Sequence, residues 1–271
     1  MIYFLSFATT NMAPSLRRIG KEARESGFFD KIYLYNEKNL DWQFRKSHRQ
    51  YFRDYPRGYG YWIWKSYLIS KIMREKMHEG DILVYLDAGC EIKSSGKKRF
   101  FEYVELLNVY SIVLFRETNQ TERKRTKYDI LQYFHVENDM NLINSSQFLS
   151  GAIFLRKDSF SIRLINLWKE TCELGKTTLL CDTPSNHKEF DGYIENRHDQ
   201  SLLSIICKTM DKEIINEDAG NYIYILHADE FWRTDWKGME KFPFWAKRNK
   251  EFSPPSVWTR IVRKLKRLLS K

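Results

Sequence analysis

Strand and helix patterns alternate along most of the chain, and this alternation restricts the possible folds more than any other feature of the sequence. Short apolar runs typical of buried strands are separated by longer stretches in which apolar residues recur at helical spacing. A helix between two strands returns the chain, so the strands it joins run parallel and the helices cover the sheet. We therefore predict an α/β fold with a mainly parallel central sheet flanked by helices.

The predicted strands and helices follow from where the apolar patterns begin and end. Strands are predicted at residues 2–7, 31–35, 82–86, 112–115, 152–155 and 222–226. Helices are predicted at residues 14–26, 61–77, 100–107, 128–134, 160–173 and 199–208, and a loop at 181–196. The run at 82–86 (ILVYL) is apolar at every position, which indicates a strand buried on both faces and therefore central in the sheet.

The chain is long and apolar enough to form a sizeable core. Its 271 residues approach the length at which single cores stop growing, and 42% of them are hydrophobic. No apolar run approaches the roughly 18 residues that argue for a membrane-spanning helix. The first residues, MIYFLSFATTNMAPS, lack the charged start and long apolar stretch of a signal peptide, so we expect them to include a buried strand.

The cysteines point to a reducing compartment. Cys90, Cys172, Cys181 and Cys207 lie far apart and show no C-x-x-C spacing, which argues against a disulfide framework or a zinc cluster. Isolated cysteines pack as small hydrophobic side chains. We expect all four to be buried and the protein to reside in the cytoplasm.

Positive charge is concentrated at the C-terminal end. Of the net charge of +10, residues 254–271 supply six positive charges and no negative one, directly after the tripeptide Ser253-Pro254-Pro255. This boundary predicts a folded domain at 1–252 and a basic tail at 253–271. Apolar side chains of the tail fall on one helical face and cations on the other, which is typical of a helix lying in a membrane interface.

The charge pattern also predicts partners. We expect residues 254–271 to dock on an anionic membrane surface, at the inner face of the cell membrane, with packing of the tail on the folded domain as the alternative. The basic run at 122–127 (ERKRTK) is short and is typical of a solvated loop. We therefore predict no nucleic-acid partner.

Polar residues follow two of the predicted strands. Asp87 stands in YLDAGCE at the carboxyl end of the strand 82–86, the edge at which open α/β sheets bind ligands. A carboxylate there can hold a divalent cation against phosphate oxygens, or it can cap a helix or form a loop ion pair. Thr9 and Thr10 end the first strand and can hydrogen-bond a nucleotide by the same topological argument.

The segment 58–65 (GYGYWIWK) places four aromatic residues and a lysine at the start of a predicted helix. Free backbone N–H groups at a helix start attract anions, and Lys65 adds a charge suited to a phosphate. Trp62 and Trp64 are either ligand contacts or core residues.

Three further positions can carry chemistry. Gly151 opens the strand 152–155, where a glycine permits close approach of a ligand or simply forms a turn. Asp199 opens the helix 199–208 in RHDQ, where it either caps the helix or faces a cleft as a general base or as a partner of a sugar-like cation. His227 ends the last strand and is either structural or a metal ligand.

Taken in chain order, these segments resemble a known family. The first-strand threonines, GYGYWIWKSY, GDILVYLDAGCE, SGAIF, RHDQSLLS and the late histidine are similar to nucleotide-sugar-dependent glycosyltransferases of the GT-A fold, in particular bacterial enzymes of capsule and O-antigen synthesis. The resemblance covers roughly residues 1–250. It implies a single Rossmann-like domain that transfers a sugar from a nucleoside-diphosphate sugar to a hydroxyl of a polysaccharide or lipid-linked acceptor.

The resemblance also implies roles for single residues. Asp87 matches the first Asp of the D-x-D motif, which binds Mn²⁺ or Mg²⁺ and the pyrophosphate, and His227 matches a late metal-binding histidine. Asp199 matches the acidic position beside the donor sugar and is the expected catalytic residue. The expected nucleotide-sugar contacts are Thr9, Thr10, Trp62, Lys65, Asp87, Ala88, Gly89, Gly151, His198 and Gln200.

This sequence departs from the D-x-D motif at its second Asp, which is replaced by Gly89. Two alternatives follow. Asp87 and His227, with help from Glu91, hold the metal ion together with the diphosphate, or fixed cations such as Lys65 take the place of the metal.

Two rival functions stand beside glycosyl transfer. A nucleotidyltransferase or another sugar-nucleotide enzyme would use the same carboxylate at the sheet edge, but the chain carries no G-x-G-x-x-G or G-x-x-x-x-G-K phosphate loop. A non-catalytic protein that binds membranes through its basic tail is the second rival.

Overall fold

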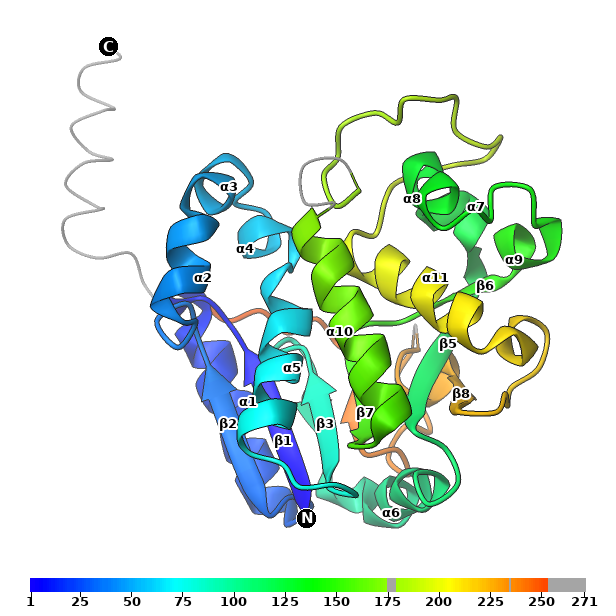
Figure 1. The fold of residues 1–271 in the computed structure, drawn as a ribbon. Coiled ribbons are helices and arrows are strands. Elements are labelled where there is room, and N and C mark those ends of the chain that lie inside the picture. Colours follow the sequence, from blue (N-terminus) through cyan, green and yellow to red (C-terminus); the bar gives the residue numbers. More distant parts are fainter. Residues whose placement is uncertain (175–178, 234, 253–271) are drawn as a thin grey trace.

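A mixed sheet runs through the centre of the molecule (Figure 1), which the computed structural model describes over residues 1–174, 179–233 and 235–252. Within these residues the strands follow the order β2-β1-β3-β7-β5-β6, and β8 pairs with β5. The strands are β1 (Ile2–Phe7), β2 (Lys31–Tyr35), β3 (Ile82–Leu86), β5 (Ile112–Thr121), β6 (Ser146–Phe148), β7 (Ala152–Arg156) and β8 (Ile223–His227). A separate small sheet pairs β4 (Glu91–Ile92) with β9 (Phe244–Trp245).

Helices cover both faces of the main sheet. The helices are α1 (Ala13–Ser26), α2 (Trp42–Ser47), α3 (Arg49–Asp54), α4 (Gly58–Tyr61), α5 (Trp64–Glu75), α6 (Lys97–Leu106), α7 (Glu122–Arg125), α8 (Tyr128–Tyr133), α9 (Met140–Asn144), α10 (Ser159–Leu174) and α11 (Asp199–Met210). Helices α5, α10 and α11 lie across the face turned to the viewer in Figure 1. Their apolar side chains join one face of the strands in one core cluster, whereas α1 and α6 join the other face in a second cluster.

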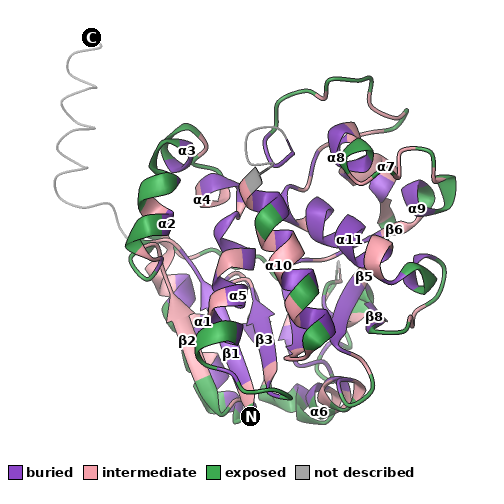
Figure 2. Cartoon of the chain, in the orientation of Figure 1, coloured by how far each residue is buried: buried purple, intermediate pink, exposed green. Residues whose placement is uncertain are grey.

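The central position of β3 is confirmed. This strand pairs with β1 on one side and β7 on the other, and Figure 2 shows it buried along most of its length. Strands β1, β2 and β3 have the bounds that their apolar runs predict. All four cysteines are buried, as expected.

The prediction of a mainly parallel sheet is wrong, because β7 runs antiparallel to both β3 and β5. The helices between β5 and β7 are α7, α8 and α9, with four, six and five residues. A helix of six residues spans only about 9 Å, so none of them carries the chain back to the opposite edge of the sheet. The chain instead turns back beside β5 as the antiparallel strand β6, and three residues later it continues in the same direction into β7.

The predicted C-terminal amphipathic helix at 253–271 lies outside the described residues. Within the part of the chain that the structure describes, no helix combines the length and the apolar character needed to cross a membrane.

Candidate active site

A buried lysine lies at the centre of the residues that the sequence singled out. The Nζ atom of Lys65 is 2.9 Å from Oδ2 of Asp199 and 3.3 Å from Oδ1 of Asp87. It also donates to the carbonyl oxygen of Ser150 at 3.2 Å and to its hydroxyl at 3.1 Å. The ring of Tyr85 lies beside the ammonium, with its centroid 5.2 Å from Nζ. This cluster, which we call the Lys65 cluster, joins segments from distant parts of the chain.

The antiparallel pairing of β3 and β7 brings the Lys65 cluster together. Because Leu86 pairs with Ala152, the carboxyl end of β3 meets the start of β7, and the N–H of Asp87 donates to the carbonyl of Gly151 at 2.9 Å. Gly151 leaves the space that this contact needs, since a Cβ there would lie 3.2 Å from Oδ2 of Asp87. Asp199 comes from the first turn of α11.

The two carboxylates of the Lys65 cluster differ in exposure. The side chain of Asp87 is 41% exposed, and that of Asp199 is 4% exposed. With two carboxylates and one ammonium, the cluster carries a net negative charge that reaches solvent through Asp87. Tyr85 donates to Oδ1 of Asp87 at 2.6 Å, and burial, together with the charge of Asp87, raises the pKa of Tyr85 well above its usual value. Its hydroxyl therefore remains a donor at neutral pH.

Burial and pairing act against each other on the buried charges. Burial alone would lower the pKa of the Lys65 ammonium, but Asp199 and Asp87 outweigh it and raise that pKa. Burial raises the pKa of Asp199, and Lys65 offsets only part of this rise. The side chain of Asp199 accepts from Lys65 and from the Ser150 hydroxyl at 3.0 Å, and it does not cap its own helix. The helix-cap interpretation of Asp199 is therefore wrong.

The turn before Lys65, which includes the short segment α4, winds left-handed. Residues 58–62 all have positive φ, between 48° and 78°, so the right-handed helix begins at Trp64 and not at 61 as predicted. Left-handed helical conformation costs L-residues roughly 1–2 kcal/mol each, and glycine at 58 and 60 removes part of that cost. The indole of Trp64 donates to the carbonyl of Gly58 at 2.9 Å and closes the turn. Strain of this kind is typical of functional sites.

The left-handed turn carries Trp62 and Tyr61 against His198. The ring centroid of His198 lies 4.4 Å from that of Tyr61 and 5.6 Å from that of Trp62. His198 adopts φ 55° and ψ −119°, a conformation that type II′ turns normally give to glycine. Its Nδ1 contacts the carbonyl of Leu180 at 2.6 Å, and burial lowers its pKa. Tyr61 donates to Asp182 at 2.9 Å, which ties the loop after α10 to the turn.

Thr9 and Thr10 lie at the end of β1, as predicted, but outside the Lys65 cluster. The hydroxyl of Thr9 donates to Asn11, and Thr10 donates its N–H to Glu37 at 2.8 Å and its hydroxyl to the same carboxylate. Gln200 contacts the Lys65 cluster through Ser150, whose N–H donates to Oε1 of Gln200 at 3.3 Å.

The loop that contains Ala88 and Gly89 is covered by a distant segment of the chain. The carbonyl of Ala88 accepts from Arg18 at 3.0 Å, and the carbonyl of Gly89 accepts from the N–H of Asn249 at 2.9 Å. A Cβ on Gly89 would lie 3.3 Å from Cα of Arg248, which is tighter than ordinary packing. The backbone at 248–249 therefore occupies space that a second Asp of the D-x-D motif would need.

His227 does not lie beside Asp87. Strands β7 and β5 separate β3 from β8, which places the backbones of Asp87 and His227 roughly 14 Å apart at the usual spacing of strands. The direct neighbour of His227 in the sheet is Arg116, and its Nε2 lies 3.3 Å from the carboxylate of Asp218.

The residues around Asp87 do not fit a metal ion. Oδ1 of Asp87 already faces the Lys65 ammonium, Gly89 offers no side chain, and Glu91 pairs with Lys93 at 2.7 Å. Among the described residues, no group of three or more His, Cys, Asp or Glu side chains is placed to hold a metal ion.

Sequence reasoning gave no role to Ser150, Tyr85 or Asp182. The first two stand in segments that were singled out: Ser150 precedes Gly151, and Tyr85 precedes Asp87 by two positions and so shares its face of the strand. Nothing in the sequence points to Asp182, because its contacts with Tyr61 and His198 depend on the path of a long loop.

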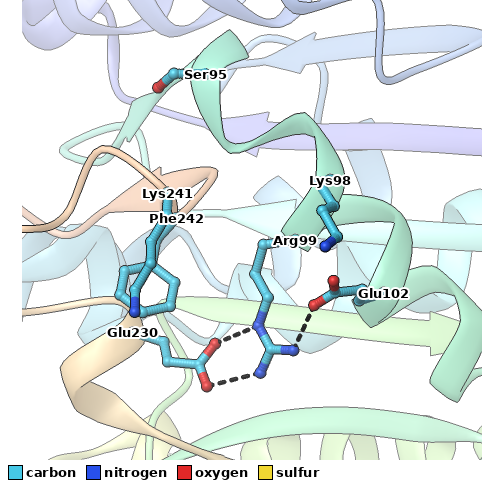
Figure 3. A pocket seen from close by; sticks show the side chains of 7 residues that line it. All are labelled: Ser95, Lys98, Arg99, Glu102, Glu230, Lys241 and Phe242. Atoms are coloured by element: carbon cyan, nitrogen blue, oxygen red, sulfur yellow. Dashed lines mark hydrogen bonds and ion pairs between the residues drawn. The ribbon is translucent and has the colours of Figure 1, made fainter.

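A cavity of about 460 Å³ lies elsewhere, beside α6 (Figure 3). Figure 3 shows Arg99 between Glu230 and Glu102, and both pairs lie at 2.7 Å. The lining residues are Ser95, Lys98, Arg99, Glu102, Glu230, Lys241 and Phe242. None of them belongs to the predicted site. The pair of Arg99 with Glu230 joins α6 to the segment after β8, and the pair with Glu102 lies within α6.

The chain is structurally similar, at low sequence identity, to several glycosyltransferases. A glycosyltransferase involved in the glycosylation of the major capsid of PBCV-1 is 11% identical, with 92% of this chain and 97% of that chain covered and a TM-score of 0.48. Mouse xyloside xylosyltransferase 1 is 13% identical (91% and 97% covered, TM-score 0.46). The galactosyltransferase LgtC, in complex with donor and acceptor sugar analogs, is 12% identical (93% and 84% covered, TM-score 0.40). No family model and no curated protein matches the chain.

Proposed function

We propose that the chain is a glycosyltransferase that moves a sugar, of the hexosyl type, from a nucleoside-diphosphate sugar to a hydroxyl group. The observation that carries the proposal is the Lys65 cluster. It lies at the carboxyl edge of β3, where open α/β sheets bind ligands, and it is built from the segments whose sequences resemble the GT-A glycosyltransferases. Lys65 is held at this edge by groups from three other segments, which is the preorganisation that an active site needs.

The proposal divides the roles in the Lys65 cluster by exposure. Asp87, which reaches solvent, contacts the donor and accepts hydrogen bonds from its hydroxyl groups. Asp199 is too deeply buried to contact substrate and is a positioning residue, because its carboxylate fixes Lys65 and the Ser150 hydroxyl. This revises the role that the resemblance implied for Asp199. Trp62 is only partly buried and is proposed to offer its ring to the donor, whereas His198 is buried and supports the rings of Tyr61 and Trp62.

Fixed cations are proposed to balance the charge of the leaving diphosphate. Arg248 is part of the backbone that covers Gly89. Burial, and after it the charges of Arg125 and Arg248, lower the pKa of Arg197. Arginine binds phosphate oxygens in a bidentate manner. The ammonium of Lys65 is already matched by two carboxylates. Arg248, whose backbone lies beside Gly89, is therefore proposed to supply positive charge at the position where the D-x-D motif would hold a metal, and we propose donor binding without Mn²⁺ or Mg²⁺.

A donor screen tests the proposed function. Nucleoside-diphosphate release from a panel of nucleotide sugars is measured with Mn²⁺, with Mg²⁺ and with EDTA. Release from at least one sugar nucleotide, equal in EDTA, is expected for the wild type and absent from Asp87→Asn. Release of pyrophosphate from a nucleoside triphosphate and a sugar phosphate would replace glycosyl transfer with nucleotidyl transfer. Release that requires the metal would overturn the cation proposal and leave glycosyl transfer in place.

The acceptor is proposed to be a hydroxyl of a lipid-linked or polysaccharide glycan of the bacterial surface. The basis is the sequence resemblance and the six cations at 254–271, which suit an anionic leaflet at the inner face of the membrane. Each such cation is worth about 1 kcal/mol near the surface. Co-sedimentation with anionic liposomes at low salt is expected for the full chain and not for a chain that ends at Ser253. Equal behaviour of the two forms would contradict membrane docking.

A further inference from the structure

A second concave site lies between α2, α3 and the left-handed turn. It has a volume of about 450 Å³, within the range of small-molecule sites, and none of the residues that line it belongs to the Lys65 cluster. The lining residues are Trp42, Arg45, Lys46, Arg49, Phe52 and Tyr59, which we call the basic pocket. Five of the six come from one stretch of thirteen residues that is helical on both sides of His48.

Helical spacing places the cations of the basic pocket on one face. Arg45 and Lys46 follow Trp42 by three and four positions, and Arg49 follows Arg45 by four, so their side chains are neighbours on the helix surface. Phe44 lies on the opposite, buried face of the same stretch. The apolar face of this stretch thus packs on the core, and its cationic face lines the pocket.

The three cations of the basic pocket lack carboxylate partners. Within the described residues, no carboxylate forms an ion pair with any of them, and Arg45 donates its Nε only to a backbone carbonyl, that of Leu40. The nearby acidic residues are committed elsewhere. Asp41 pairs with Lys71 and Tyr67, and Glu37 accepts from Thr10. The pocket therefore presents three positive charges that its own surroundings do not neutralise.

Two aromatic rings border these charges. Trp42 is 63% exposed, and the ammonium of Lys46 lies 4.7 Å from its ring centroid. The ring of Tyr59 is held in place by stacking on Phe52, with the two ring centroids 4.2 Å apart. A flat aromatic ring beside cations suits a ligand that has both a ring and an anionic group.

We propose that the basic pocket binds a phosphate attached to a ring, as in a nucleotide or a sugar phosphate. A single carboxylate would satisfy one cation, whereas a phosphate or diphosphate carries the charge and the oxygen atoms to engage all three. The two arginines bind phosphate oxygens, Lys46 adds a point charge, and Trp42 and Tyr59 contact the ring. The inference concerns binding alone and does not rest on the proposed glycosyl transfer.

The position of Tyr59 links the basic pocket to the Lys65 cluster. Tyr59 and Trp62 belong to the same left-handed turn, and Trp62 stacks on His198, next to Asp199. A ligand that contacts Tyr59 therefore contacts the segment that leads into Lys65.

Titration calorimetry on the full chain tests the pocket. The probes are inorganic pyrophosphate, UDP and glucose 1-phosphate, with uridine and glucose as unphosphorylated references. Arg45→Gln/Arg49→Gln is expected to weaken binding of all three phosphates by at least about tenfold, since hydrogen bonds between charged groups typically exceed the 1.4 kcal/mol that tenfold represents. Trp42→Ala is expected to weaken the binding of UDP and of glucose 1-phosphate and to leave the affinity for pyrophosphate unchanged.

The control variant is Arg17→Gln/Arg24→Gln, which removes the same charge from two exposed positions on α1. It is expected to bind all three phosphates within about twofold of the wild type. The proposal is overturned if no phosphate binds, if the control loses as much affinity as the pocket variant, or if Lys65→Met removes all binding and the pocket variant removes none. In that last case the phosphates bind at the Lys65 cluster, and the proposed function stands without the basic pocket.

Discussion

Two of the fully buried lysines, Lys65 and Lys208, are partnered in opposite ways. Lys208 faces one carboxylate, Glu122, at 2.6 Å, and both side chains are 0% exposed. Lys65 faces two carboxylates, and one of them reaches solvent. Burial lowers the pKa of Lys208 despite Glu122, whereas the two carboxylates raise the pKa of Lys65.

The Lys208 pair is a closed network, and the Lys65 cluster is an open one. Glu122 accepts from Lys208, Thr126, Ser204 and Gln147, so its charge is matched and its oxygens are satisfied inside the protein. The Lys65 cluster has an excess negative charge and an exposed carboxylate oxygen. A closed network supports structure, whereas an open one is ready to bind a ligand, and each network predicts a different response to mutation.

The largest expected effect is on the closed network. Lys208→Met leaves the charge of Glu122 buried and uncompensated, which typically costs about 3–5 kcal/mol of unfolding free energy. Denaturant unfolding measures this loss. The double variant Lys208→Met/Glu122→Gln removes the stranded charge and is expected to recover part of it. If the single variant is as stable as the double, the pair carries no buried charge and the comparison fails.

Asp87→Asn is expected to lower turnover strongly while leaving stability nearly unchanged. Because Asp87 is half-exposed and Lys65 keeps Asp199, the unfolding free energy should change by less than about 1 kcal/mol. Because this carboxylate is proposed to contact the donor, its loss should lower turnover at least about 10²-fold, comparable to the removal of one transition-state contact. Steady-state kinetics and denaturant unfolding on the same preparations measure both. Turnover within threefold of wild type would remove Asp87 from the active site.

Asp199→Asn is expected to lie between these two. The substitution leaves Lys65 paired with Asp87 alone in a buried position, so both stability and turnover should fall, the latter by about tenfold as for a hydrogen bond to a charged group. Asp199→Glu provides the conservative comparison, because it keeps the charge and lengthens the side chain. Lost turnover with unchanged affinity for the donor would support positioning of Lys65, whereas unchanged turnover would make Asp199 purely structural.

The comparison also explains which parts of the site the sequence could predict. Lys65, Asp87 and Asp199 were each recognisable from strand ends, helix starts and the family resemblance. Their convergence depends on β7 running antiparallel to β3, and an apolar run carries no information about strand direction. The sequence predicts a solvated loop for the short basic segment 122–127, but Glu122 is buried in the structure. Its structural role could not be predicted, because its partners come from α11 and β6.

The left-handed turn and Gly89 show a second limit of sequence reasoning. GYGYW continues into an amphipathic pattern, so it predicts a helix, and its positive φ angles depend on packing against residues of α3 and on the His198 loop. Gly89 is recognisable as a departure from a motif. The reason for it lies in residues 248–249, about 160 positions later in the chain, and such a contact exists only in the folded molecule.

The smallest expected effect comes from His198, which borders the open network and has no excess charge of its own. Burial lowers the pKa of His198, so its folded-state pKa lies below that of an unfolded histidine, about 6.5. As the pH falls below that of neutral water towards the folded-state pKa, the unfolded chain takes up a proton that the native ring does not. The unfolding free energy should therefore decrease as the pH falls through this window. Above the window, the stability contribution of the neutral His198 ring should be complete. Asp182, with an oxygen 3.5 Å from Nε2, limits the decrease, because it would stabilise the protonated ring. Denaturant unfolding between pH 7.5 and 5, compared with His198→Asn, isolates the contribution from other titrating groups. A flatter profile for the variant is expected, and identical profiles would mean that the buried ring takes up its proton in the native state.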